Sequence, residues 1–454
     1  MPEISPPRHV EVLDVSIMSM RKLALSALLL FLIRVVLIAW GGQHDAPMGD
    51  QLAFYSASQQ LARSGLEWFN GGGEFGYRAP MYFVYLSGIF SIVPGSTFLT
   101  GQIATALIGT LNCLIVFALI RNLSGGADGR LGFWLRGLLP FFVVSDTFVM
   151  SEPLFAMFLL TALLVISINP NCTDSRQVFA LGALVGFCLL TREVAIVYPI
   201  IFGGYLVAAA DSRQDGFRRA AIFTLTLIIT LTPWMWRNTV VWGQPLPLSY
   251  TSGVNLHIGN NPEAIGKWIR FPSSLEATAD FGTPQYDAWH RKEAFKHIAE
   301  NPMSFIRLGF NKVAWFLWPR FERESIKEMY KLPAKPATIV SGILGLSSAV
   351  LMIGGVVGFI FAKRDWLWCI STVLIAYTVF VTFVVYGSPR YRDAVDYLLL
   401  IFLALGAARS RAIWAELRIN GPSVRKPLWV LVPVLAYIFL SWMWVAYDLS
   451  RSGH

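Results

Sequence analysis

Long apolar stretches alternate with short polar segments along most of the chain. Apolar runs close to membrane length cover residues 23–41, 100–120, 131–149, 152–168, 177–190, 194–210, 220–236, 337–361, 366–386, 394–408 and 428–447. A transmembrane helix needs about 20 apolar residues to cross about 30 Å of hydrocarbon. The pattern therefore predicts an all-α polytopic membrane protein with about 11 transmembrane helices, several of them short.

The composition agrees with this class. Of the 454 residues, 55% are hydrophobic and only 14% are charged, whereas a soluble domain carries about 25% charged residues. The four cysteines form no CxxC pair, and HRKEAFKH is not the HExxH zinc motif. We therefore expect no cofactor and no metal centre built on a CxxC or HExxH motif. A divalent ion bound by carboxylates stays an open alternative.

The basic residues predict the orientation. The formal charge of +9 comes from 37 Lys and Arg against 28 Asp and Glu, and Lys and Arg gather in alternate short loops. This positive-inside pattern predicts a cytoplasmic N-terminus (1–22) and an external tail (448–454), in a bacterial inner membrane. The first apolar run is as long as a span and lacks a cleavage site, so we expect an anchor. Nucleic acid is not an expected partner.

Two long loops lie on the predicted external face. The first, 42–98, belongs to an N-terminal transmembrane module (23–236) and contains LAFYSASQQLARSG, whose spacing allows a helix in the membrane interface. RAPMYFVYLSGIFSIVPG follows and predicts a re-entrant or interfacial segment, with a full span as the alternative. The second loop, 237–336, precedes the C-terminal module (337–447) and contains the amphipathic YDAWHRKEAFKHIAENP and the aromatic KVAWFLWPRF.

Polar residues near the apolar runs fall mostly on the external face. A charge at membrane depth costs about 2.5–3.5 kcal/mol, so one that persists needs a partner or a function. Arg34, inside the first run, either snorkels or pairs. The external set comprises Asp45, Asp50, Glu74, Arg78, Asp146, Glu152, Arg192, Glu193, Arg237, Asn238, Arg390, Arg392 and Asp393. We therefore expect any chemistry to face outward.

Two carboxylates of this set have two interpretations each. Asp50 precedes the predicted interfacial helix, where it is either an N-cap or a general base whose pKa the apolar surroundings raise. In SEPLF, Ser151 as N-cap with Glu152 in the first turn accounts for the motif by capping alone. A second carboxylate on the face of Asp50 favours a functional role, but the residues leave both interpretations open.

The arginines near the C-terminal end of the chain also have two interpretations. GSPRYRDAV places Arg390 and Arg392 two residues apart, and in an extended segment their guanidinium groups would point the same way and suit a phosphate. Alternatively, Arg392 and Asp396 are one helical turn apart and can pair. Arg192, in LLTREVAI between two apolar runs, is the least surface-like arginine of the set.

Taken in order, these motifs resemble the GT-C superfamily of membrane glycosyltransferases, in particular the branch of protein O-mannosyltransferases (glycosyltransferase family 39) and lipid A aminoarabinose transferases. The ordered elements are Asp50 with Tyr55 and Ala57, then RAPMY, SEPLF, LLTRE, PWMWRN, G-x-N-x-x-x-G-N-N-P from Gly253 to Pro262, E-N-P and PRYRDAV. The resemblance extends from about residue 22 to residue 408.

The resemblance implies transfer of a sugar from a polyprenyl-phosphate donor to an acceptor hydroxyl on the periplasmic face, with inversion. Asp50 matches the family's catalytic base and Glu152 its second acidic residue. The substrate-binding positions it implies are Arg78, Tyr55, Arg192, Arg390, Arg392, Tyr391, Arg237 and Asn238. Many relatives carry a second acid after the loop aspartate, but Gln51 stands here, which puts a divalent-metal site in doubt.

One aspartate and several arginines would suffice for this chemistry. The acceptor hydroxyl must lose a proton to one carboxylate base, whereas the leaving phosphate needs only fixed positive charge. The expected partners are a polyprenyl-phosphate sugar, membrane lipid, and an acceptor glycolipid, polysaccharide or protein. The alternatives are a transporter or lipid flippase, which should show charges or broken helices near the bilayer midplane, and an O-antigen ligase or polymerase.

Overall fold

The computed structural model describes residues 19–41, 49–65, 74–124, 129–269, 280–319, 326–327, 330–410 and 421–452. Within these ranges the chain is helical and has no strand; one isolated β-bridge pairs Lys267 with Gly387. The all-α fold class predicted from the apolar runs is therefore confirmed. The predicted N-terminal segment and the end of the tail lie largely outside the described residues.

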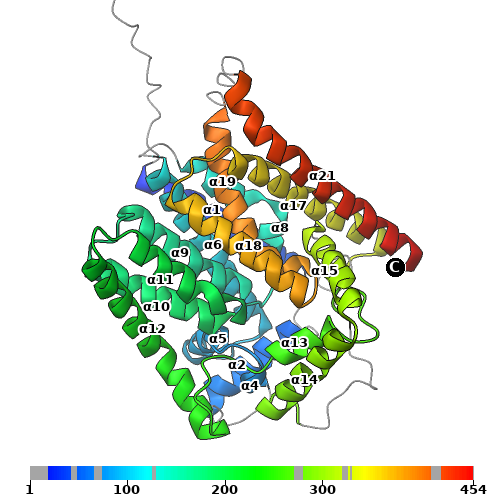
Figure 1. Ribbon diagram of the computed structural model, residues 1–454. Coiled ribbons are helices and arrows are strands. Elements are labelled where there is room, and N and C mark those ends of the chain that lie inside the picture. Colours follow the sequence, from blue (N-terminus) through cyan, green and yellow to red (C-terminus); the bar gives the residue numbers. More distant parts are fainter. Residues whose placement is uncertain are drawn as a thin grey trace, which may run out of the picture.

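Long helices form the body of the molecule (Figure 1). The N-terminal part contains α1 (Met20–Gly41), α6 (Phe98–Leu123), α7 (Arg130–Leu138), α8 (Pro140–Ser145), α9 (Glu152–Ile168), α10 (Ser175–Thr191), α11 (Tyr198–Ala208) and α12 (Arg213–Trp242). The C-terminal part contains α17 (Ala334–Ile360), α18 (Trp366–Val384), α19 (Asp393–Ala408) and α21 (Gly421–Ser452). Their packed faces share one large apolar core that includes residues of both parts.

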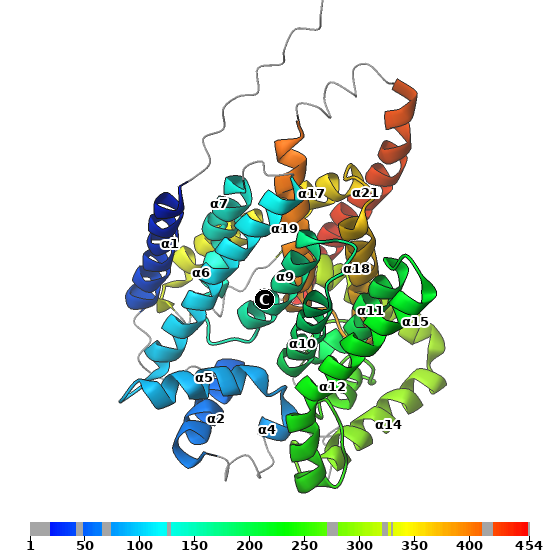
Figure 2. The same cartoon turned by 90° about the vertical axis from the view of Figure 1, so that its left-hand side faces the viewer.

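Short helices gather at one end of this bundle. They come from the two long loops and are α2 (Asp50–Ser64), α4 (Glu74–Tyr77), α5 (Met81–Ile92), α13 (Ser252–Ile258), α14 (Pro284–Glu300) and α15 (Pro302–Leu317). In both views α2, α4, α5 and α14 lie below most of the long helices, at the level of the lower end of α12 (Figure 2). The helices predicted at LAFYSASQQLARSG and YDAWHRKEAFKHIAENP are thus confirmed. With 12 residues α5 is about 18 Å long, too short for a full span.

In the described part of the chain, six helices are long and apolar enough to cross a membrane: α1, α6, α12, α17, α18 and residues Trp429–Leu449 of α21. The helices α5, α9 and α10 and the segment Glu193–Ala208 are apolar but shorter. These helices make the chain an integral membrane protein. The count of 11 spans and the orientation stay predictions.

Two prolines act differently from what the apolar pattern predicted. The run 131–149 is not one helix, because α7 ends at Leu138 and Leu139 is extended before Pro140 starts α8. Proline lacks an N–H donor and forces the preceding residue out of the helical region. In contrast, α12 continues through Pro233 to Trp242. Arg237 and Asn238, which were predicted in a loop, therefore lie inside a helix.

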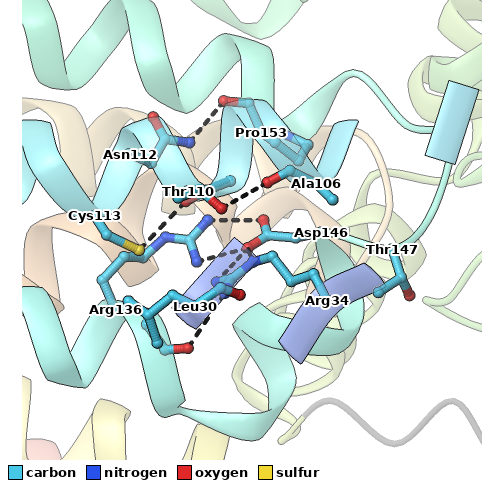
Figure 3. Close-up of polar contacts among 12 residues, drawn as sticks. Leu30, Arg34, Ala106, Thr110, Asn112, Cys113, Arg136, Asp146, Thr147 and Pro153 are labelled. Atoms are coloured by element: carbon cyan, nitrogen blue, oxygen red, sulfur yellow. Dashed lines mark hydrogen bonds and ion pairs between the residues drawn. The ribbon is translucent and has the colours of Figure 1, made fainter. Parts of the chain in front are cut away.

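A buried ion cluster joins α1, α7 and the segment before α9 (Figure 3). Asp146 was predicted at an external helix end, but it is only 1% exposed. Its carboxylate accepts from Arg34 Nε at 2.9 Å and from Nη1 and Nη2 of Arg136 at 2.8 and 2.7 Å. Arg136 also donates to the Tyr397 hydroxyl at 2.8 Å. Placing Asp146 in the external set was therefore wrong, and Arg34 pairs rather than snorkels.

A glycine makes this cluster possible. A Cβ added at Gly109 of α6 would lie 2.2 Å from Cγ of Asp146, closer than any two non-bonded carbon atoms approach. The missing side chain lets the carboxylate lie directly against α6, out of water. There it needs both arginines, since an unpaired buried charge is strongly unfavourable.

Asp146→Asn should destabilise the protein. Removing the carboxylate leaves two buried guanidinium groups without their counter-ion, which costs about 3–5 kcal/mol of unfolding free energy. Thermal unfolding of the purified protein in detergent measures the loss. Asp174→Asn is the matched control, because Asp174 is the exposed N-cap of α10 and asparagine caps equally well. Equal midpoints for the two variants would contradict a stabilising role of the cluster.

Candidate active site

Five charged side chains meet at the end of the bundle that holds the short helices. They come from separate parts of the chain: Asp50 from the first turn of α2, Arg78 from the link between α4 and α5, Glu152 from the start of α9, Arg192 from the end of α10, and Arg390 from the 3-10 turn η3 (Pro389–Arg392). We call this set the charged cluster. All five were predicted as site residues.

Arg390 lies at the centre of the charged cluster. Its Nη1 donates to Asp50 Oδ2 at 2.7 Å, and its Nη2 and Nε donate to Glu152 Oε1 at 2.8 and 3.1 Å. On the outer sides, Arg78 Nη2 lies 2.9 Å from Asp50 Oδ1, and Arg192 Nη1 lies 2.9 Å from Glu152 Oε1. Cations and carboxylates therefore alternate along one continuous network.

Neither carboxylate caps its helix. The N-cap of α2 is Gly49, with a positive φ of 71° and no side-chain cap bond, so the Asp50 carboxylate is directed to the arginines instead. Ser151 precedes α9 but makes no side-chain cap bond either, and Glu152 pairs with two arginines. The capping interpretation of Asp50 is therefore wrong. Ser151 is the N-cap of α9 with Glu152 in its first turn, as predicted, but capping alone does not account for the two ion pairs of Glu152.

The electrostatics of the charged cluster favour anions. Burial raises the pKa of Asp50, but the Arg390 and Arg78 guanidinium groups outweigh burial and hold that pKa below its ordinary value. The predicted rise in the Asp50 pKa is thus wrong in direction. Three guanidinium groups against two carboxylates leave a net charge of +1 in the set. Side-chain exposures of 32% for Asp50 and 37% for Arg390 keep both within reach of a substrate.

A small pocket borders the charged cluster. Arg192, Arg390, Tyr391 and Asp393 supply its polar lining, and Phe155, Tyr198 and Val194 are among its apolar neighbours. The Tyr391 ring also packs against Tyr386 with centroids 5.0 Å apart. Tyr391 is therefore beside the charged cluster, as its place in PRYR predicted.

Arg392 points away from the charged cluster. It is 0% exposed, and its Nε donates to Asp396 at 2.7 Å. Nη1 donates to the carbonyls of Phe316 and Trp318 at 2.9 Å, and Nη2 to Ser348 at 2.6 Å. The segment after Pro389 is a 3-10 turn and not extended, so the side chains of Arg390 and Arg392 diverge. The expected shared phosphate site is wrong, and the Asp396 pairing is confirmed.

Three further predicted residues have partners that are not members of the charged cluster. Tyr55 packs edge-on against Phe90 and Phe98, and its hydroxyl accepts from Gln59 at 2.7 Å. Arg237 lies over the rings of Trp234 and Trp242 and donates to Asn238 at 3.0 Å. Asn238 in turn donates to the carbonyl of Leu246 at 2.7 Å. Arg237 and Asn238 thus order the chain that leaves α12.

Two residues that received no role hold neighbouring segments in place. Gln51 Oε1 accepts from the Val149 N–H at 3.0 Å, which ties α2 to the segment before Glu152. Glu193 accepts from Ser249 and from Thr251, and burial raises its pKa to about 8. Two features of the sequence pointed to these residues: Gln51 directly follows Asp50, and Glu193 belongs to LLTRE. Asp45 and the side chain of Glu74 lie outside the described residues.

The acidic, histidine and cysteine side chains do not gather into a metal site in the described ranges. Within these ranges they form no group of three or more that could hold a metal ion. The two carboxylates of the charged cluster are both bound by arginines, and Gln51 replaces the second acid. A cofactor-free site stays a prediction.

A family model matches the central part of the chain. The family is described as dolichyl-phosphate-mannose-protein mannosyltransferase, and the match covers residues 77–236, which include Arg78, Glu152 and Arg192. This match confirms the resemblance to GT-C membrane glycosyltransferases. Among curated proteins no sequence matches the chain.

Solved structures give a weaker likeness. ArnT from Cupriavidus metallidurans, bound to undecaprenyl phosphate, is 14% identical with a TM-score of 0.37, over 84% of this chain and 77% of that chain. The archaeal oligosaccharyltransferase AglB from Archaeoglobus fulgidus, in complex with an inhibitory peptide and a dolichol-phosphate, is 13% identical with a TM-score of 0.42, over 94% of this chain and 56% of that chain. At these scores we draw no conclusion from them.

Proposed function

We propose that this protein is an inverting glycosyltransferase that moves a sugar from a polyprenyl-phosphate donor to an acceptor hydroxyl at the outer face of the membrane. The observation that carries the proposal is the charged cluster, in which an accessible aspartate lies within 3 Å of two arginines at one end of a membrane-spanning bundle. The matched family, named for a sugar linked to dolichyl phosphate, supports a donor of this type.

Asp50 is the proposed base. The acceptor hydroxyl approaches the anomeric carbon from the side opposite the phosphate and gives its proton to the Asp50 carboxylate as the new C–O bond forms. The bond from the anomeric carbon to the phosphate oxygen breaks at the same time, and its electron pair leaves with the phosphate. One displacement inverts the anomeric configuration.

The arginines are the proposed phosphate site. The leaving phosphate gains negative charge as the bond breaks, and guanidinium groups held in place beforehand stabilise that charge without reorganisation. Arg390 and Arg192 contact the same oxygen atom, Oε1 of Glu152, so their guanidinium groups lie close enough together for one phosphate to contact both. Glu152 contacts both and orients them, a role that fits its contacts better than proton transfer.

The location suits a lipid-linked substrate. The charged cluster joins α2 of the first long loop to the ends of two apolar helices, because Glu152 begins α9 and Arg192 follows α10. A prenyl tail there can stay in hydrocarbon while its phosphate reaches the arginines. The positive-inside pattern supports the outer face as the side of transfer.

Asp50→Asn should abolish transfer. Removing a general base typically lowers the rate by about 10²–10⁴-fold, while the arginines that bind the donor are retained. Mass spectrometry of envelope glycans and lipids, with and without the gene, identifies the mass that is lost. The wild-type gene and Asp174→Asn should restore that mass and Asp50→Asn should not. Restoration by Asp50→Asn would refute the base assignment, and solute transport into liposomes without a new glycosidic bond would favour a transporter.

Arg192→Ala and Arg390→Ala should weaken binding of polyprenyl phosphate. Each removes charge-assisted hydrogen bonds worth about 1.5–3 kcal/mol, equivalent to a loss of affinity of roughly ten- to a hundredfold. Titration of the purified protein in nanodiscs measures the dissociation constant. Arg63→Ala is the control, since Arg63 is exposed at the end of the same helix as Asp50. Unchanged affinity in both site variants would remove these arginines from the phosphate site.

The pH dependence should follow the pKa of Asp50. A base must be ionised, and two arginines hold this pKa below its ordinary value. The acid limb of kcat/KM should therefore lie below about pH 3.9. Arg78→Ala removes one of the lowering charges and should move the limb to higher pH, whereas Arg63→Ala should not. A limb that stays in place in Arg78→Ala would show that another group limits the rate.

A further inference from the structure

The motif from Gly253 to Pro262 has no part in the proposed chemistry, yet its asparagine contacts a fully buried lysine. Lys312, in α15, is 0% exposed. Its Nζ donates to Asn260 Oδ1 at 2.8 Å and to the carbonyl of Val384 at 3.1 Å. Both bonds go to neutral oxygen atoms. A lysine in such a place is costly to bury, so its retention calls for a function.

The junction is centred on the end of α18. Val384 is the last residue of that helix, and the carbonyls of a last turn lack helical partners. Its carbonyl accepts from Lys312 and also from Asn260 Nδ2 at 2.9 Å. Asn260 Nδ2 donates in addition to Leu256 at 2.7 Å. One carbonyl therefore joins α15, the loop after α13 and the start of the segment that leads to Arg390.

The same segment is held tightly by backbone contacts. A Cβ at Gly387 would lie 2.1 Å from the carbonyl oxygen of Lys312, and one at Gly259 would lie 1.6 Å from that of Val385. The Gly387 N–H donates to Gly266 at 2.8 Å. Residues 384–387 are thus enclosed between α15 and the loop after α13, with no room for larger residues at these glycines.

The other end of the segment is attached to α15 as well. Arg392 donates to the carbonyls of Phe316 and Trp318, at the C-terminal end of α15. Lys312 therefore holds the beginning of residues 384–392, and Arg392 holds their end. Arg390 lies between the two attachments and is the residue that reaches Asp50 and Glu152.

We propose that Lys312 is a positioning residue for Arg390, and that α15 fixes the backbone of the segment 384–392 at both ends. The inference rests on the proposed function, because it assigns to the second external loop the task of holding a phosphate-binding arginine. A misplacement of such a group by about 1 Å can cost up to about a hundredfold in rate. The contacts with α15 restrict the movement of the backbone around Arg390 before the donor binds.

A lysine suits this junction at any working pH. Burial lowers the pKa of the Lys312 amine to about 7. The charged and the neutral amine both carry at least two N–H donors, so both bonds persist when the proton is lost. Methionine has a similar length and volume but cannot donate, so Lys312→Met removes the two bonds with little change in packing.

A double-mutant cycle tests the proposal through binding of polyprenyl phosphate to the full-length protein in nanodiscs. Lys312→Met should weaken binding about three- to tenfold and Arg390→Ala by tenfold or more, while the double variant should bind no more weakly than Arg390→Ala alone. Lys296→Met, at an exposed position of α14, is the matched control and should bind like the wild type. This non-additivity distinguishes a residue acting through Arg390 from one that only supports the fold.

Each outcome has a defined meaning. Two results would overturn the positioning role of Lys312 and leave the proposed function unaffected. One is wild-type affinity in a folded Lys312→Met variant, and the other is a loss of affinity that adds fully to that of Arg390→Ala. Unchanged affinity in Arg390→Ala instead overturns the phosphate site itself. If Lys312→Met does not fold, Asn260→Ala takes its place: it removes one of the two Lys312 bonds and one of the two bonds to the Val384 carbonyl, and it is judged by the same criteria.

Discussion

A charge taken out of water is stabilised by an opposite charge in contact, and at two clusters this interaction determines how the helices of this protein meet. Asp50, Glu152 and Asp146 lie where helices converge, and each pairs with an arginine from a distant part of the sequence. Arg390 contacts Asp50 across 340 residues and Glu152 across 238. Arg34 contacts Asp146 across 112. Apolar packing alone is not directional, so these ion pairs select one arrangement of the bundle.

The ion cluster at Asp146 and the charged cluster contain the same residue types but have different roles, because their side chains differ in exposure. At Asp146 the arginines are fully buried and bound by protein groups, so that cluster stabilises the junction of α1 and α7. In the charged cluster the side chains of Asp50 and Arg390 are partly exposed, and Arg192 and Arg390 border a pocket, so this cluster remains accessible from outside. Under the proposed function, a phosphate that binds Arg390 would replace Asp50 and Glu152 as the anionic partner of that arginine.

The apolar runs predicted the long helices well, because a helix that spans a membrane is visible in the sequence as one apolar stretch of matching length. It also placed Asp50, Arg78, Glu152, Arg192 and Arg390 on one face, and these five do meet. Asp146 was misplaced because a residue's position near the end of an apolar run does not reveal the glycine opposite it. The sequence left both the capping and the functional interpretations of Asp50 and of SEPLF open, because caps and ion pairs use the same residue types, and only the contacts decide between them.

The two arginines of PRYR show why local conformation, and not residue type, assigns these roles. In an extended strand, residues i and i+2 share a face, whereas a 3-10 turn has three residues per turn and rotates them by about 240° relative to each other. Pro389 opens the turn with its fixed φ, after which Arg390 faces the carboxylates and Arg392 faces α15. One arginine therefore holds the segment while the other remains accessible. The second long loop contacts this backbone on both sides of Arg390, because Lys312 of α15 donates to Val384 and Arg392 donates to Phe316 and Trp318, although α15 donates no side chain to the charged cluster.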